Sequence, residues 1–155
     1  MKQNELMKLA ADADEALKNN LLDKALEISE VISRYNRSAG LAYKGVVALR
    51  KEDFDLAEEL LLESFQLNAK QHLALANLIP TYIKKRDFKK AVAFGEQAHA
   101  AMPKNQSVCI NFAAALLQEQ SYSKALEILK PHLDLEKPNV SVLSGLISCY
   151  RSLFM

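Results

Sequence analysis

The chain has 155 residues, of which half are hydrophobic and a quarter are charged, and its formal net charge at neutral pH is +1. This length and composition are typical of one globular domain with a continuous core, and they exclude a disordered chain. The near-zero charge argues against a general nucleic-acid binder, which would carry a strong basic excess.

Apolar residues recur at helical spacing along nearly the whole chain, and short polar turns separate the helices that this spacing predicts. The chain has only four glycines and is rich in Ala, Leu, Lys and Glu, which favours helix throughout. In chain order, the predicted helices pair as hairpins over residues 3–19 with 22–35, 38–51 with 54–67, 72–85 with 88–101, and 106–119 with 122–135. A ninth helix is predicted over residues 140–153, and Pro131 is expected to kink the eighth helix.

The hairpins repeat with a period of 34 residues. This interval separates the aromatic residues Phe54, Phe88 and Tyr122, the alanines Ala57, Ala91 and Ala125, and the pair Asn77 and Asn111. A fixed period of this length is typical of stacked helical hairpins, each of which is too small to bury its own apolar face. Alanine at the repeated position allows two helices to approach closely.

The third hairpin shows the repeat most completely, with Leu75, Tyr82, Phe88, Ala91, Ala98 and Pro103 in register. This pattern resembles that of the tetratricopeptide repeat family. The resemblance covers about residues 6–139 and implies an all-α fold, a right-handed α-solenoid of about nine helices stacked as antiparallel hairpins. We therefore expect a single domain over residues 1–155, with repeats at about 6–37, 38–71, 72–105 and 106–139 and a final helix at about 140–153.

In that architecture the first helix of each hairpin lines a concave groove. The residues expected to line it are Tyr43, Val46, Leu73, Asn77, Pro80, Ile110, Asn111, Ala114, Gln118, Ser144 and Ser148. Small apolar side chains with a few hydrogen-bonding ones suit an extended peptide or a single helix. The repeated carboxamides of Asn77 and Asn111 can each donate to and accept from a peptide unit, although they can equally pair with neighbouring helix backbone.

We therefore expect a non-catalytic scaffold for protein–protein interaction, whose protein or peptide partner the sequence does not name. One alternative is an N-terminal interaction module of a larger bacterial transferase-type enzyme, and another is a self-associating assembly module. The three histidines lie on separate hairpins without a paired nucleophile or a phosphate-binding loop. We expect no catalytic residue and no cofactor.

A basic cluster around the third hairpin turn is a candidate anion patch, although such clusters are commonly solvated turns. It consists of Lys84, Lys85, Arg86, Lys89 and Lys90.

The last helix is expected to bury Val142, Leu143, Leu146, Ile147 and Tyr150 against the preceding hairpin. Its apolar end is compatible with a fragment of a longer protein, with a homo-oligomer formed through this helix, or with a frayed terminus.

No membrane-spanning or metal-binding segment is predicted. The longest apolar run, Val108 to Leu117, is interrupted by Asn111 and is too short to cross a bilayer. The cysteines Cys109 and Cys149 form no CxxC motif and have no histidine at ligand spacing, so we expect buried free thiols and no metal. The first residues lack a signal-peptide pattern, and the expected location is the cytoplasm.

Overall fold

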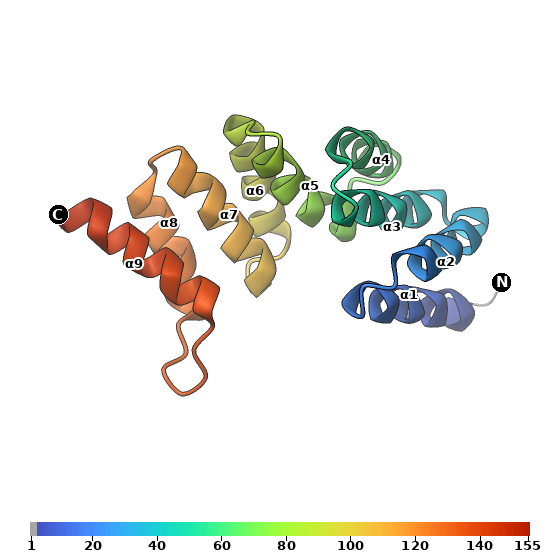
Figure 1. Cartoon of the computed structure of the whole chain (residues 1–155), viewed down its shortest axis with the longest axis horizontal. Helices are drawn as coiled ribbons and strands as arrows, with labels where there is room; N and C mark the ends of the chain where they lie inside the picture. The colour runs from blue at the N-terminus through green and yellow to red at the C-terminus, as the bar shows by residue number, and fades with distance from the viewer. Residues whose placement is uncertain (1–2) are drawn as a thin grey trace. The chain divides into compact units, whose positions relative to one another are not determined.

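The computed structural model describes residues 3–155, and the described residues form helices and turns without any strand (Figure 1). In chain order the α-helices are α1 Gln3–Lys18, α2 Leu22–Tyr35, α3 Arg37–Arg50, α4 Phe54–Leu67, α5 His72–Lys84, α6 Phe88–Ala101, α7 Gln106–Gln118, α8 Tyr122–Leu129 and α9 Val140–Phe154. The all-α prediction is confirmed, and every helix except the eighth ends within one residue of its predicted bounds. Residues 1 and 2 of the predicted domain lie outside the described part.

The eighth helix is shorter than predicted. The expectation that Pro131 merely kinks this helix is wrong, because α8 ends at Leu129 and a 3₁₀ turn, η1 (Lys130–His132), follows it. Proline has no backbone N–H, and its ring collides with the carbonyl four residues back, so the helix cannot continue through it. The chain then forms a loop, visible between α8 and α9 in Figure 1, in which the Asp134 carboxylate accepts hydrogen bonds from the backbone N–H groups of Glu136 and Lys137.

The chain divides into two compact units, the first of which ends at Thr81 and the second of which runs from Tyr82 to Met155. Helix α5 crosses this boundary one residue after Pro80, the one proline inside a described α-helix. In the first unit α1 packs on α2, α2 on α3 and α3 on α4. In the second unit α6 packs on α7, α7 on α8, and α9 on both α8 and α7. The single domain over residues 1–155 stays a prediction.

Small residues stand where helices of the first unit pass closest to each other. Ala25 and Ala57 have no exposed surface. A side chain added to Gly45 of α3 would come within 2.6 Å of Leu61 on α4. On the same pair of helices, the hydroxyl of Ser38 donates to the carbonyl of Ser64 (2.8 Å) and the hydroxyl of Ser64 donates to the carbonyl of Ser38 (2.6 Å). The close approach that the repeated alanines predicted is thus present in this unit.

The second unit follows the same rule. Ala91 and Ala125 are fully buried, and a side chain added to Gly95 of α6 would overlap the Phe112 ring on α7. Its core combines residues of three helices, namely Phe112, Ala113, Leu116, Ala125, Leu129, Val142, Leu146 and Cys149.

The buried face of α9 differs from the predicted one. Val142, Leu146 and Cys149 are buried, whereas Ile147 and Tyr150 are exposed, so the expectation that these two pack on the preceding hairpin is wrong. Gly145 explains the orientation, because its missing side chain leaves room for the Leu129 side chain of α8. The close contact at Gly145 turns Ile147 and Tyr150 away from the core.

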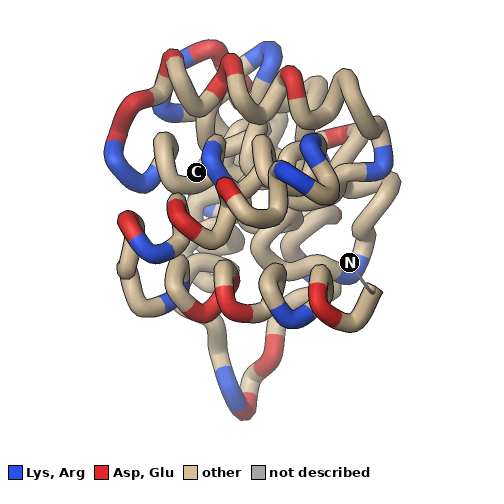
Figure 2. The backbone as a smooth tube through the Cα atoms, turned by 90° about the vertical axis from the view of Figure 1, so that its right-hand side faces the viewer, with Lys and Arg blue, Asp and Glu red and all other residues tan. Residues whose placement is uncertain are grey.

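Charged residues of both signs are interspersed along most of the chain (Figure 2), whereas residues 84–90 are mainly basic. Some of them join neighbouring helices, as in the ion pairs Glu30–Lys44 (2.9 Å) and Glu96–Lys124 (2.6 Å). Both pairs are solvent-accessible, so each contributes about 1 kcal/mol or less.

The turns inside the hairpins share one backbone conformation. Their left-handed residues are Asn20 (φ 56°), Glu52 (φ 62°), Arg86 (φ 61°) and Gln120 (φ 59°). The next residue closes the turn by donating its N–H to a carbonyl five residues back, as Ser121 does to Leu116 (2.8 Å). Of these four residue types, asparagine adopts left-handed backbone most readily, whereas the others carry a steric penalty.

Replacing Gln120 with glycine is expected to raise the free energy of unfolding of the chain by about 0.5–1 kcal/mol, because glycine has no Cβ penalty at this φ. Urea unfolding followed by circular dichroism would measure the change. Asn20→Gly, at the equivalent turn, serves as the control and is expected to have a smaller effect. A lower stability for Gln120→Gly than for wild type would contradict the assignment of strain to this residue.

Candidate functional site

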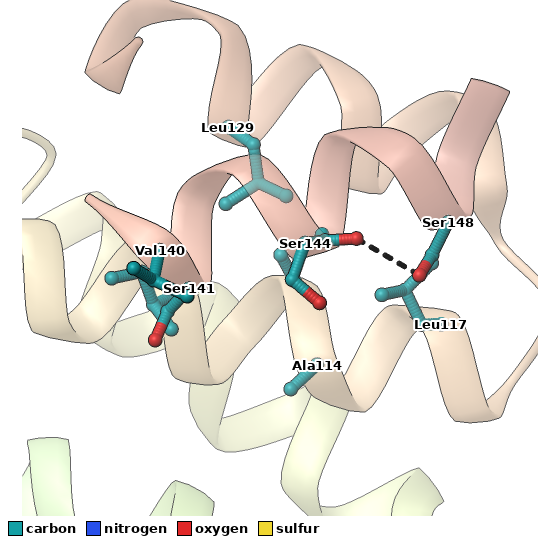
Figure 3. A pocket seen from close by; sticks show the side chains of 10 residues that line it. Ala114, Leu117, Leu129, Val140, Ser141, Ser144 and Ser148 are labelled. Atoms are coloured by element: carbon teal, nitrogen blue, oxygen red, sulfur yellow. Dashed lines mark hydrogen bonds between the residues drawn. The ribbon is translucent and has the colours of Figure 1, made fainter. Parts of the chain in front are cut away.

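A hollow of about 350 Å³ lies in the second unit between α7 and α9 (Figure 3). It is lined by Ile110, Ala113, Ala114 and Leu117 of α7, Leu129 of α8, and Val140, Ser141, Ser144, Gly145 and Ser148 of α9. Ile110, Ala114, Ser144 and Ser148 belong to the set predicted to line a groove, and the structure brings these four together. We call this site the α7–α9 hollow.

The serines of α9 form one wall of the α7–α9 hollow. Ser141, Ser144 and Ser148 are spaced three and four residues apart, so they lie on one face of the helix. The start of α9 is fixed by Asn139, whose side chain accepts hydrogen bonds from the N–H groups of Ser141 (2.9 Å) and Val142 (3.2 Å). In Figure 3 the side chains of Ser141 and Ser144 point toward α7, where Ala114 lies.

The lining combines apolar carbon with hydroxyl groups and includes no charged side chain. The hydroxyl of Ser148 donates to the carbonyl of Ser144 (2.9 Å), which Figure 3 marks with a dashed line. Within residues 3–155 the hydroxyls of Ser141 and Ser144 make no hydrogen bond and are exposed. Such hydroxyls can both donate to and accept from a peptide backbone, so the site can hold an uncharged segment.

The sequence did not predict the contribution of Leu129. This residue comes from α8, the second helix of its hairpin, whereas the predicted groove was counted along first helices alone. Its place in the hollow follows from the close contact at Gly145. The feature that places Leu129 in the hollow is therefore the contact between Gly145 of α9 and Leu129 of α8. Spacing of residues along a single helix does not reveal such a contact between two helices.

The two repeated asparagines lie in different units and have different surroundings. The Asn77 amide donates to the carbonyl of Leu73 in its own helix (2.8 Å). This bond agrees with the alternative given above, in which the asparagine side chain pairs with helix backbone. Asn111 is half-buried on α7, and its side chain makes no hydrogen bond within the described part of the chain. Neither residue lines the α7–α9 hollow.

Tyr43 and Val46 offer almost no surface to a ligand, since they are 7% and 5% exposed and belong to the core of the first unit. The Tyr43 hydroxyl donates to the Asp14 carboxylate (2.9 Å) and lies 3.2 Å from the carbonyl oxygen of Ala10, which joins α3 to α1. Burial, and then the hydrogen bond and charge of Asp14, raise the pKa of Tyr43 well above its ordinary value.

The remaining residues predicted to line the groove differ in burial. Leu73 is half-buried and packs against the core of the first unit, and Pro80 is also half-buried. Gln118 is exposed at the end of α7.

The five residues of the basic cluster are all exposed. Lys90 Nζ lies 3.6 Å from the Asp87 carboxylate and 5.3 Å from the centre of the Tyr82 ring. Arg86 occupies the left-handed position of the turn between α5 and α6. Lys90 is therefore engaged within the chain, and the role of the cluster as an anion patch stays a prediction.

Both cysteines are buried free thiols, as predicted, and burial raises the pKa of each. Among residues 3–155, no group of three His, Cys, Asp or Glu side chains is placed to hold a metal ion. No described helix has the length and apolar character that crossing a membrane requires.

Comparisons with known proteins agree with the repeat pattern. Residues 82–148 match the family model described as tetratricopeptide repeat. A search of curated proteins gave no match.

Solved structures are similar over nearly the whole chain. A MamA D159K mutant has a TM-score of 0.73 and 17% identity, with 96% of this chain and 88% of that chain covered. MamA from Desulfovibrio magneticus RS-1, from residue 41 to its end, has a TM-score of 0.73 and 15% identity, with coverage of 97% and 86%. A tetratricopeptide repeat protein from Parabacteroides merdae ATCC 43184 has a TM-score of 0.70 and 16% identity, with coverage of 97% and 60%. At these identities the likeness concerns the fold.

Replacing Tyr43 with phenylalanine is expected to lower the free energy of unfolding by about 1 kcal/mol near neutral pH, because the partly buried hydrogen bond to Asp14 is lost. The raised native pKa means that the folded state retains the phenolic proton. Its stabilising contribution is full below the unfolded pKa of about 10 and is lost as the pH rises above it. The difference between wild type and variant should therefore shrink in alkaline urea titrations.

Tyr35→Phe is the control for this measurement, because Tyr35 is exposed. A constant difference between wild type and Tyr43→Phe from neutral to strongly alkaline pH would contradict the assigned role of Tyr43.

Proposed function

We propose that this chain is a tetratricopeptide repeat protein and a non-catalytic scaffold, which binds a peptide or a single helix of another protein in the α7–α9 hollow. The family match over residues 82–148 and the similar fold of solved structures over nearly the whole chain support this proposal. The tetratricopeptide repeat fold generally mediates protein–protein interaction. The observation that carries the proposal is the hollow itself, in which exposed hydroxyl groups flank an apolar floor.

The volume and the chemistry of the hollow favour a short segment of the partner. A volume of about 350 Å³ is at the lower end for ligand pockets, so it suits a few side chains rather than a large cofactor. The absence of a charged residue in its lining favours small uncharged side chains at the point of contact. The hydroxyls of Ser141 and Ser144 then bond the backbone of the bound segment.

Asn111 extends the proposed binding surface along α7. It lies one residue from Ile110 and three from Ala114, both of which line the hollow. Its half-buried amide makes no hydrogen bond within residues 3–155, so both its donor and its acceptor are available to a peptide unit. Asn77 is a weaker candidate because its amide already donates to Leu73.

Filling the hollow tests the proposal. A peptide library displayed on phage would be selected against the wild-type chain, and the Kd of the best peptide would be measured by fluorescence anisotropy. Ala114→Met places a larger side chain in the hollow and is expected to weaken binding at least about tenfold, which is about 1.4 kcal/mol. Ala93→Met, at an exposed position of α6 outside the hollow, is the matched control and should bind as wild type does. Equal Kd values for all three proteins would rule out the hollow as the binding site.

The two asparagines give a second test with the same selected peptide. Asn111→Ala is expected to weaken binding about tenfold, because a half-buried hydrogen bond to the peptide is lost. Asn77→Ala is expected to change the Kd less than about twofold. Thermal unfolding of each variant should stay close to that of wild type. An unchanged Kd for Asn111→Ala would remove this residue from the proposed surface.

A further inference from the structure

An exposed apolar stripe runs along α9, on a different face from the serines. Leu143, Ile147, Tyr150 and Phe154 are spaced four, three and four residues apart, so they lie along one side of the helix. Ile147 is 63% exposed, Tyr150 is 44% exposed and Phe154 is 75% exposed, whereas Leu143 is half-buried. The rings of Tyr150 and Phe154 stack on each other with centroids 5.9 Å apart. We call these four residues the α9 stripe.

The repeat indicates what kind of structure covers such a stripe. The residues of α7 that precede Leu143, Ile147 and Tyr150 by one period are Cys109, Ala113 and Leu116. All three are at most 1% exposed. Ala113 and Leu116 share a core cluster with Ala125 and Leu129 of α8, the hairpin partner of α7. The equivalent face of α9 is therefore one that this fold covers with a helix.

We infer that the α9 stripe pairs with the same stripe of a second copy of the chain, in an antiparallel arrangement about a two-fold axis. The spacing of the stripe is the same in both directions. An axis midway between Ile147 and Tyr150 places Ile147 against Tyr150 of the second copy and Leu143 against Phe154 of the second copy. Each contact then joins an aliphatic to an aromatic side chain, and each occurs twice, as in an isologous interface.

The charge of α9 favours a second copy over a strongly charged partner. Arg151 is the only charged residue of the helix. In the two-fold arrangement the two Arg151 residues are offset by five residues, roughly 7–8 Å along the helix axis. This offset, added to the lateral separation of the helices, is comparable to the Debye length in physiological salt, so their repulsion is small.

The interface is small, which sets the strength of the association. A fully covered aromatic side chain buries about 150–250 Å², and those of the stripe are already partly covered. The total area is therefore below the roughly 1,200 Å² of standard interfaces, and the association is weak and reversible. None of the four stripe residues lines the α7–α9 hollow, so pairing leaves the hollow open.

Sedimentation velocity over a concentration series, from low micromolar to millimolar, tests the pairing. Wild type should shift from monomer toward dimer as the concentration rises. Ile147→Glu and Tyr150→Lys should each weaken the dimer at least about tenfold. Leu135→Glu, which removes an even more exposed apolar residue in the loop before α9, is the control and should dimerise as wild type does. Circular dichroism would check that each variant keeps its helix content.

Mixing the two variants tests the arrangement. In a heterodimer of Ile147→Glu with Tyr150→Lys, the two substituted side chains face each other with opposite charge, and the second contact remains Ile147 against Tyr150. The mixture should therefore associate more strongly than either variant alone. A mixture that associates no better than its components would overturn the antiparallel arrangement. A wild type that stays monomeric up to millimolar concentration would overturn the pairing itself.

Peptide binding and self-association have separate readouts. The Ala114→Met variant should dimerise as wild type does, and Ile147→Glu should bind the selected peptide as wild type does. The failure of one proposal is thereby distinguishable from the failure of the other.

Discussion

The structure depends on the close approach of helices at positions where no larger side chain fits. Ala57 and Ala91 have no exposed surface, and a side chain on Gly95 would overlap the Phe112 ring of the neighbouring helix. Ridges of one helix can enter the grooves of the next only at this separation. Because the small residues recur at one period, close helix contacts of the same kind occur in both units, and within each unit helices that could not fold alone share one core.

The same constraint explains which predictions from sequence succeeded. The helices were predictable because their apolar spacing and the 34-residue period agree. Both features can be recognised in the sequence without knowing which helices pack together. The end of α8 was not predicted correctly, because Pro131 was expected to kink the helix. Only four residues of the predicted helix follow Pro131, so few backbone hydrogen bonds would be gained by continuing the helix beyond it. The polar turns were predicted, but the left-handed backbone of residues such as Gln120 was not, because the hairpin imposes it rather than the residue type.

The candidate site was only partly predictable, because exposure depends on neighbours that a count along one helix does not include. Tyr43 was assigned to an open groove, yet Asp14 of α1 binds its hydroxyl in the core of the first unit. Helix α9 has two apolar faces, and the contact of Gly145 with Leu129 decides which of them enters the core. Ser144, which the sequence assigned to a groove, lines the α7–α9 hollow on the face of α9 where small residues cluster.

Helix α9 therefore has three faces: a core face, a serine face that lines the α7–α9 hollow, and the exposed α9 stripe. The faces are independent because each follows its own set of positions on the helix. Pairing through the stripe would bring two hollows into one assembly without changing either of them. A partner with two matching segments could then occupy both hollows, and the effective concentration of the second contact would strengthen a binding that is weak at a single site. If both proposals hold, the weak pairing would compensate for the weak binding at a single hollow when the partner carries repeated segments.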